Sequence, residues 1–225
     1  MDTKKAVLFD LDGTLIDTAS DFIRIIRLMC DKYDYPCPLD SQIREQVSAG
    51  SRAMVQLMFG NTADFNDDKL AAYRQEFLDL YEADICVDSR LFEGLDELLT
   101  TLEQRSIPWG IVTNKPRYLA QTLLDRLNLS KRCAVLVCPD DVEHTKPSPE
   151  PMFLACNALN IAAKDCIYVG DHLRDIQAGN AANMLTVAVK YGYLSADDKA
   201  NLQAWQADIV VDTPKDLVDM ILSYI

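Results

Sequence analysis

The sequence predicts an α/β protein with a doubly wound parallel sheet and a second, small all-helical domain inserted after the first strand. Over residues 88–225, short apolar runs of strand length alternate with amphipathic helical patterns, which is typical of a doubly wound sheet. Residues 17–85 show helical patterns alone. Two carboxylates and a glycine follow the first apolar run, so a candidate site lies at the end of that strand.

Six apolar runs predict the strands of the sheet. Runs of three or four residues that are rich in Val and Ile suit strands buried on both faces of a parallel sheet. In chain order the runs are Ala6–Phe9, Trp109–Val112, Ala134–Val137, Cys166–Val169, Thr186–Val189 and Ile209–Val211. Apolar residues at helical spacing predict helices between the runs, over residues 95–102, 119–127 and 152–159.

The helical insert is predicted to be a separate cap domain. One helical stripe covers residues 22–33 and another residues 70–80, with two shorter helices expected between them. Helices that only cover one face of the sheet would need a shorter connection than this one. The insert also has apolar faces of its own, which favours a separate domain. The predicted division is a core of residues 1–16 and 86–225 and a cap of residues 17–85.

Composition and charge limit the classes of partner. The 225 residues are 49% hydrophobic and 25% charged, which is ordinary for a globular protein and excludes a disordered chain. With 22 Lys and Arg against 35 Asp and Glu, the net charge is −13. Neither nucleic acid nor an anionic membrane is therefore an expected partner. A small anionic substrate still fits, because it needs only a local positive site or a metal.

The cysteines and the apolar runs predict a cytoplasmic protein. The seven cysteines are odd in number and form no C-x-x-C pair, which favours reduced thiols over disulfides. The first apolar run is too short for a signal peptide, and no run approaches the length of a membrane span. With only His144 and His172 as imidazole ligands, a zinc site is not expected.

Three or four carboxylates are predicted to converge on one crevice. Asp10 and Asp12 end the first strand, and Asp171 follows the run that ends at residue 169. If Asp171 opens a helix, Asp175 lies on the same face one turn later. Two carboxylates about 4 Å apart repel by roughly 4 kcal/mol at an effective dielectric of about 20. A hard divalent cation removes that repulsion, and all-oxygen ligands suit Mg²⁺.

Two other strand ends offer groups that bind phosphate. Thr113, Asn114 and Lys115 follow the strand at residues 109–112, at a turn that can present a hydroxyl and backbone N–H groups. Lys146 precedes a proline-rich helix start. Lysine, hydroxyl and N–H groups around a carboxylate and a metal are what phosphoryl transfer requires. A surface position for Lys146 is the plain alternative, as is a simple helix-face position for Asp175.

Arg52 is a candidate specificity residue in the cap. A loop at residues 50–52 that reaches over the crevice would bring its guanidinium to a substrate carboxylate. An exposed arginine with no such role is an equal alternative. The same two interpretations apply to Lys115.

The four motifs, in this order, resemble those of the haloacid dehalogenase superfamily. The matching segments are Asp10-x-Asp12-Gly13-Thr14, Thr113 after an apolar strand, Lys146-Pro147 and Gly170-Asp171-x-x-x-Asp175. They span the core from end to end. The insert resembles the helical cap of the subgroup that contains the phosphoglycolate phosphatases. Some members of that branch act on N-acetylmuramic acid 6-phosphate.

The resemblance implies roles for the acidic residues. Asp10 is the expected nucleophile, which forms an aspartyl-phosphate, and Asp12 is the expected general acid and base. Asp10, the backbone carbonyl of Asp12 and Asp171 are the expected Mg²⁺ ligands. Asp175 is expected to help through a water or by orienting Lys146. Because the dehalogenases of the superfamily lack an acid at the position of Asp12, the chain is expected to act on phosphate esters.

The remaining residues of the motifs are expected to hold the phosphoryl group or to shape the helix after Asp171. Thr113, Asn114 and Lys146 are the expected phosphate ligands. His172 stands where a small polar or acidic residue is usual, and it is expected to face solvent at the helix N-terminus, with a contact to the outer shell of the metal as the alternative. Asn183 replaces a glycine after that helix and suits the same left-handed conformation.

The expected function is Mg²⁺-dependent hydrolysis of a small phosphorylated metabolite, with 2-phosphoglycolate first and N-acetylmuramic acid 6-phosphate second. A capped sugar phosphomutase would use the same core and release no net phosphate. A receiver-type signalling domain would have no cap and no use for Asp12. A non-catalytic binding protein would be expected to lack Asp10 or Asp12. The expected oligomeric state is a monomer or a homodimer.

Overall fold

Six parallel strands form the central sheet of the protein. The computed structural model describes residues 4–60 and 65–225, and its strand order is β5-β4-β1-β6-β7-β8. The bounds are β1 (Ala6–Phe9), β4 (Trp109–Val112), β5 (Val135–Val137), β6 (Cys166–Gly170), β7 (Leu185–Val189) and β8 (Ile209–Val211). All six predicted strands are confirmed, with a shift of one residue at one end of β5, β6 and β7. The predicted α/β fold class is therefore correct.

Helices cover both faces of the sheet. Val7 and Phe9 belong to one core and Ala6 and Leu8 to the other, because successive strand residues point to opposite faces. The first face is covered by α5 (Leu95–Gln104), α6 (Arg117–Arg126) and α10 (Pro214–Tyr224), and the second by α7 (Glu150–Leu159) and α8 (Leu173–Ala181). Burial on both faces explains why the strands read as continuous apolar runs.

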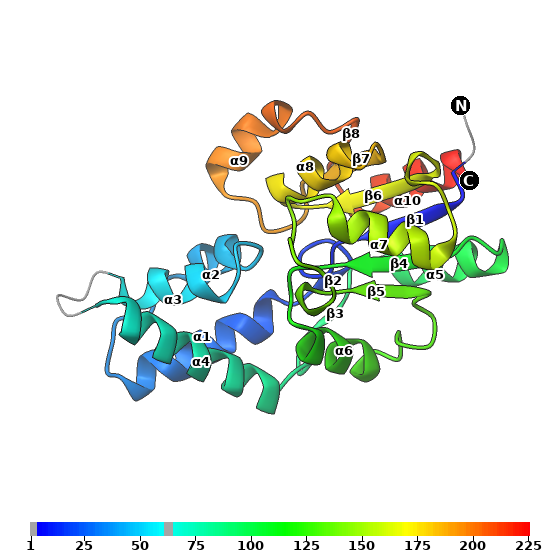
Figure 1. Ribbon diagram of the computed structural model, residues 1–225. Coiled ribbons are helices and arrows are strands. Elements are labelled where there is room, and N and C mark those ends of the chain that lie inside the picture. The colour runs from blue at the N-terminus through cyan, green and yellow to red at the C-terminus, as the bar shows by residue number, and fades with distance from the viewer. Residues whose placement is uncertain (1–3, 61–64) are drawn as a thin grey trace.

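The insert after the first strand forms a layer of four helices beside the sheet. These are α1 (Ala19–Lys32), α2 (Asp40–Gln46), α3 (Ser51–Phe59) and α4 (Asp67–Ala83). Figure 1 shows them facing the ends of the strands at which the arrowheads point. Their apolar faces meet around Phe22, whose ring stacks on Tyr81 at 4.5 Å and on Phe77 at 5.8 Å between ring centroids. Treating this layer as a separate domain stays a prediction.

A short antiparallel ribbon joins the helical layer to the sheet. It consists of β2 (Ile16–Asp17) and β3 (Arg90–Leu91), which enter and leave the insert side by side. Strands of two residues carry no readable periodicity, so sequence patterning did not predict them. The remaining elements are α9 (Ala196–Asn201) and the 3₁₀ turns η1 (Pro139–Asp141), η2 (Ala163–Asp165) and η3 (Leu202–Trp205). Within residues 4–60 and 65–225, no helix has the length and apolar character that a membrane span needs.

Candidate active site

Asp10 and Asp12 lie where β1 ends, at the junction of the sheet and the helical layer. The backbone N–H of Asp10 donates to the carbonyl of Val169 at 2.8 Å, which ties it to the neighbouring strand β6. The hydroxyl of Thr18 donates to Oδ1 of Asp12 at 2.7 Å. Gly13 follows with a φ of 83°, and a Cβ there would lie 2.2 Å from Oδ2 of Asp171. Glycine is therefore required both for the turn and for the approach of Asp171.

Lys146 is the buried cation of the site. Its ammonium lies 2.8 Å from Oδ1 of Asp10 and 2.6 Å from Oδ1 of Asp175, and its side chain is only 1% exposed. It also donates to the carbonyl of Val112 at 2.8 Å and to the hydroxyl of Tyr168 at 3.0 Å. The structure thus places Lys146 inside the crevice, and the surface alternative is wrong. Asp175 is its fully buried partner rather than an exposed carboxylate on a helix face.

Asp171 is held by donors from three parts of the chain. Its Oδ2 accepts from the backbone N–H of Tyr193 at 2.8 Å and from the hydroxyl of Ser48 at 2.7 Å. Its Oδ1 lies 3.5 Å from the hydroxyl of Thr14. Burial, and then the charges of Asp10 and Asp175, raise the pKa of Asp171 to about 8. Lys146 therefore leaves negative charge in this cluster uncompensated.

The acidic cluster fits a hard divalent cation. Three buried side chains form it, namely Asp10, Asp171 and Asp175. Each offers one carboxylate oxygen, and these three oxygens lie within 4.8 Å of one another. An all-oxygen donor set with surplus negative charge is the chemistry that Mg²⁺ and Ca²⁺ select. Asp175 is already committed, because its Oδ1 meets Lys146 and its Oδ2 accepts from the N–H of His172 at 3.1 Å. Asp10 and Asp171 are the freer candidates to hold a metal.

Thr113 and Asn114 lie at the turn after β4. The Thr113 hydroxyl accepts from the N–H of Lys115 at 3.1 Å, and the Asn114 amide donates to the carbonyl of Lys146 at 3.1 Å. The second bond links the turn after β4 to the loop that carries Lys146. The two predicted phosphate ligands therefore lie at the same end of the sheet as Asp10, and both line the cleft described below.

Lys115 forms a buried ion pair with Asp12. Its ammonium lies 3.1 Å from Oδ1 of Asp12 and 3.1 Å from the hydroxyl of Tyr81 in α4. It also lies 4.8 Å from the ring centroid of Phe22 and 4.4 Å from that of Tyr81, within the range of cation–π attraction. Lys115 therefore joins the core to the helical layer and places positive charge directly against Asp12.

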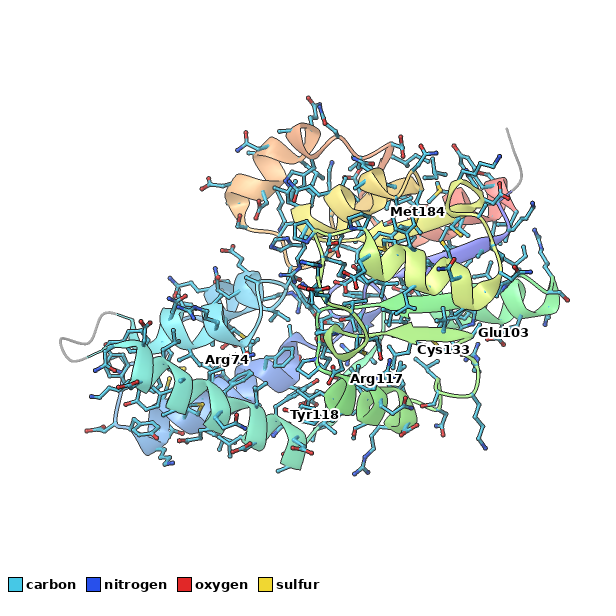
Figure 2. The ribbon with its side chains drawn as sticks, in the orientation of Figure 1. Arg74, Glu103, Arg117, Tyr118, Cys133 and Met184 are labelled. Carbon is cyan, nitrogen blue, oxygen red and sulfur yellow. The ribbon has the colours of Figure 1, made fainter. Side chains whose placement is uncertain are left out.

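A cleft of about 460 Å³ opens between the sheet and the helical layer. Asp10 and Asp12 line it at the sheet, and Arg52 and Arg74 line it from the helices. Arg74 belongs to α4, and its Nε donates to the hydroxyl of Ser51 at 3.0 Å; Figure 2 shows it among the helices of the insert. Apolar side chains complete the wall, namely Phe22, Val47, Met54, Phe77, Leu78, Tyr81 and Leu119. The cleft is polar at its floor and largely apolar along its side.

Arg52 is not buried in the cleft. Its side chain is 64% exposed and lies 3.9 Å from Asp67 in a surface ion pair. It lines the cleft from the start of α3 rather than from a loop, and the structure shows no partner for it in the core among the described residues. Its proposed role in specificity therefore depends on a substrate that reaches the helical layer.

His172 begins α8 but does not face solvent. Its ring is partly buried, and its Nδ1 accepts from the backbone N–H of Arg174 at 3.2 Å as the N-cap of the helix. Burial, and then the charge of Arg174, lower the pKa of His172 to about 4. The expectation of a solvent-facing histidine is wrong, because the ring nitrogen is used as a helix cap. Asn183 has a φ of 61°, which confirms the left-handed conformation predicted for it.

Several residues of the site were not identified from the sequence. Ser48, Arg74, Tyr81 and Arg174 all line the cleft, and no motif marks them. Their positions depend on how the helical layer sits against the sheet. Only Arg174 carried a usable signal, because it lies one residue before Asp175 on a helix predicted to face the crevice.

The family of the chain follows from a match over most of its length. A family model described as haloacid dehalogenase-like hydrolase matches residues 7–189. The chain belongs to this family. The match includes Asp10 and Asp12, the helical insert, Lys146, Asp171 and Asp175. The resemblance drawn from the four motifs is thereby confirmed.

Relatives of this haloacid dehalogenase-like hydrolase are phosphatases. An N-acetylmuramic acid 6-phosphate phosphatase of Pseudomonas putida is 46% identical over 95% of this chain and 94% of that protein. A phosphoglycolate phosphatase of Xanthomonas campestris is 44% identical over 95% of this chain and 94% of its own length. The chain is accordingly a phosphatase, a hydrolase that acts on phosphoric monoesters.

Solved structures share the fold. A protein of Haemophilus somnus, described as a predicted phosphoglycolate phosphatase, superposes with a TM-score of 0.84. The superposition covers 98% of this chain and 99% of that one at 23% sequence identity. At that identity the likeness establishes the fold alone. Phosphatases of the family generally use Mg²⁺.

Proposed function

We propose that this phosphatase hydrolyses a phosphomonoester with Mg²⁺, through a covalent phosphate on Asp10. The observation that carries the proposal is the placing of two different carboxylates at the floor of one cleft. Asp10 is backed by Lys146 and by the acidic cluster, whereas Asp12 lies two residues on and is paired with Lys115. Both carboxylates line the cleft, but Asp10 belongs to the acidic cluster and Asp12 does not.

The metal site is proposed to consist of Asp10, Asp171 and the backbone carbonyl of Asp12. Asp175 supports the site through its bond to Lys146. When bound, Mg²⁺ supplies positive charge that offsets the carboxylate repulsion and the charge of the phosphoryl oxygens. Lys146, Thr113 and Asn114 are proposed to orient the phosphoryl group for in-line attack.

The first half of the reaction transfers the phosphoryl group to Asp10. A carboxylate oxygen of Asp10 attacks phosphorus, and the bond between phosphorus and the ester oxygen breaks. Asp12 donates its proton to that oxygen, so the leaving group departs as a neutral alcohol. The products of this step are the alcohol, the aspartyl-phosphate of Asp10 and the carboxylate of Asp12.

The second half regenerates the enzyme. The Asp12 carboxylate removes a proton from a water molecule as the water oxygen attacks phosphorus, and the bond to Asp10 breaks. Inorganic phosphate leaves, Asp10 is again a carboxylate and Asp12 again carries the proton. Lys115, whose ammonium lies 3.1 Å from Asp12, is placed to offset the negative charge that Asp12 carries between the two half-reactions.

The proposed substrate is a phosphorylated metabolite that carries a carboxylate, with 2-phosphoglycolate as the first candidate. Arg52 and Arg74 line the cleft from the helical layer and supply guanidinium groups that suit a carboxylate. Relatives 44% identical to this chain are named for phosphoglycolate. The two-carbon acid would leave part of the cleft to water.

N-acetylmuramic acid 6-phosphate is the second candidate, and the size of the cleft favours it. About 460 Å³ lies in the range of roughly 300–1,000 Å³ typical of sites for much larger ligands. The apolar wall formed by residues such as Met54 and Phe77 could cover an acetamido methyl group and a sugar ring. Relatives 46% identical to this chain are named for this substrate.

A substrate panel tests the proposed function and the choice of substrate. Mg²⁺-dependent phosphate release is measured with 2-phosphoglycolate, N-acetylmuramic acid 6-phosphate, hexose phosphates and nucleotides. A hundredfold preference in kcat/KM, about 2.7 kcal/mol of discrimination, would identify the substrate. Isomer formation without phosphate release would instead identify a phosphomutase and overturn the proposal.

Asp10→Asn tests the nucleophile. The variant is expected to keep the fold, to lose turnover and to show no phosphate adduct by mass spectrometry after an acid quench, because an amide cannot form the acyl phosphate. Wild-type protein quenched during turnover is expected to carry the adduct on the peptide that contains Asp10. Activity near that of the wild type in Asp10→Asn would rule out the assignment.

Arg52→Ala tests the recognition of a substrate carboxylate. We expect kcat/KM to fall for carboxylate-bearing substrates and to stay unchanged for p-nitrophenyl phosphate, because only the former offer a partner for the guanidinium. An equal loss of kcat/KM for both kinds of substrate would show that Arg52 does not recognise the substrate carboxylate.

A further inference from the structure

Ser48 joins the helical layer directly to a candidate metal ligand. It lies between α2 and α3, in the turn that faces the sheet in Figure 1, and it is 5% exposed. Its hydroxyl donates to Oδ2 of Asp171 at 2.7 Å across 123 residues of chain. Its backbone carbonyl accepts a hydrogen bond from Nη2 of Arg174. Two residues at the start of α8 therefore hold Ser48, one through its side chain and one through its backbone.

The neighbouring residues show that the turn is built to present this hydroxyl. Val47 is buried in the apolar core, and the hydroxyl of the next residue, Ser48, reaches Asp171. Arg44, in α2, stacks on the ring of Tyr193 at 4.8 Å and pairs with Asp17 at 3.3 Å. The backbone N–H of Tyr193 is the other donor to Oδ2 of Asp171. The α2–α3 segment thus contacts this carboxylate oxygen directly through Ser48, and it also contacts, through Arg44, the residue whose N–H is the second donor.

The hydrogen bonds of Asp171 are unequal. Oδ2 accepts from Ser48 and Tyr193 at 2.7 and 2.8 Å, whereas Oδ1 has, among residues 4–60 and 65–225, only the Thr14 hydroxyl at 3.5 Å. Oδ1 is therefore the oxygen left to coordinate a cation. Donors that fix one oxygen of a ligating carboxylate orient the other, and their loss weakens metal binding.

We propose that Ser48 is a positioning residue through which the helical layer orients Asp171 for Mg²⁺, so that docking of the α2–α3 turn and metal binding favour each other. The proposal rests on the metal site of the proposed function. Coupling of this kind is reciprocal: if the docked turn strengthens metal binding, bound metal stabilises the docked turn by the same factor. The metal site would then be complete only when the helical layer has closed over the cleft.

The experiment measures Mg²⁺ affinity by isothermal titration calorimetry in the full chain. Ser48→Ala is expected to raise the Kd for Mg²⁺ about tenfold to a hundredfold. Ser48→Thr, which keeps the hydroxyl, is expected to stay within about threefold of the wild type. The matched control is Ser51→Ala in the same turn, because its hydroxyl bonds Arg74 and does not reach Asp171. Its Mg²⁺ affinity should equal that of the wild type.

Hydrogen exchange supplies the reciprocal readout. Mg²⁺ is expected to slow exchange of the amides of residues 40–52 in the wild type and to leave it unchanged in Ser48→Ala. Equal Mg²⁺ affinity and equal protection in wild type and Ser48→Ala would overturn the proposal while leaving the proposed function intact. A wild-type protein that binds no Mg²⁺ would overturn the proposed function as well. If Ser48→Ala does not fold, Ser48→Cys, a weak donor of similar size, takes its place.

Discussion

At the scale of single residues, the site depends on one buried ammonium. Lys146 touches Asp10, Asp175, the Val112 carbonyl and the Tyr168 hydroxyl, all within 3.0 Å. A buried charge is tolerated only when such partners replace its water. The lysine in turn makes it possible for the acidic cluster to be buried. From the sequence, Lys146 could be identified only as a lysine that follows a strand. How strongly the buried carboxylates depend on its charge could not be predicted.

Lys146→Met is expected to destabilise the metal-free protein strongly. Removing one member of a buried ion pair costs about 3–5 kcal/mol, because the remaining carboxylates lose their compensation. Urea unfolding in EDTA measures the loss. The matched control is Lys5→Met, whose ion pair with Asp165 is 65% exposed on the lysine side and should cost less than about 1 kcal/mol. A similar small loss for both variants would contradict this account of Lys146.

At the scale of elements, the junction between the helical layer and the sheet is held by Asp21. This residue of α1 is fully buried and accepts from the backbone N–H groups of Asp88 and Ser89 at 3.0 and 3.1 Å. Arg24, one turn on, pairs with it at 3.1 Å. Burial alone would raise the pKa of Asp21, but hydrogen bonds from the Ser89 hydroxyl, the Asp88 N–H and Arg24 outweigh it and lower the pKa below the ordinary 3.8. The Asp21 carboxylate therefore links α1, at the start of the helical layer, to residues 88 and 89, where the chain leaves that layer.

Asp21→Asn is expected to lower the free energy of unfolding by about 1–3 kcal/mol at pH 7. Since the folded-state pKa is lowered, the wild-type advantage is fully present above pH 3.8. It should fade as the pH falls below 3.8 through the folded-state pKa. Urea titrations from pH 7 to pH 3 measure the difference. Asp31→Asn, an exposed change in the same helix, is the control and should stay within about 0.5 kcal/mol. A difference that does not depend on pH would contradict the role of the Asp21 charge.

At the scale of the whole molecule, negative charge gathers where the sheet and the helical layer meet. The chain carries a net charge of −13, and three of its carboxylates are buried together. The raised pKa of Asp171, about 8, shows that this cluster is costly without a cation. Folding, metal binding and closure of the cleft are therefore expected to be linked energetically.

Mg²⁺ is expected to raise the melting temperature of the wild type, and EDTA to reverse the effect. At a free Mg²⁺ concentration of 100 times the Kd, the stabilisation should be about 2.7 kcal/mol. Asp171→Asn should melt no lower than the wild type in EDTA, because the amide replaces a carboxyl group whose ionisation is unfavourable in this buried cluster, and it should lose most of the Mg²⁺ response. An equal response in both proteins, measured by calorimetry, would place the metal elsewhere.

The sequence by itself determined the sheet, the helical insert and the residues at the strand ends. These features depend on local patterns, because apolar periodicity and the end of a buried strand can be read within a few residues. Asp10, Asp12, Lys146 and Asp171 could be identified in this way. Asp10, Asp12 and Asp171 follow the ends of strands, which predicts that they meet, whereas Lys146 lies in a loop after β5 and was placed at the crevice with the help of the family resemblance.

Only the tertiary structure decided how the helical layer engages the site. Lys115 meets Asp12 across 103 residues and Ser48 meets Asp171 across 123, and neither contact follows from a local pattern. Their partners depend on the orientation of one packed unit against another, which is set by side chains far apart in the chain. The reactive residues of the core could therefore be predicted from the sequence, whereas the contacts that couple them to the helical layer could not.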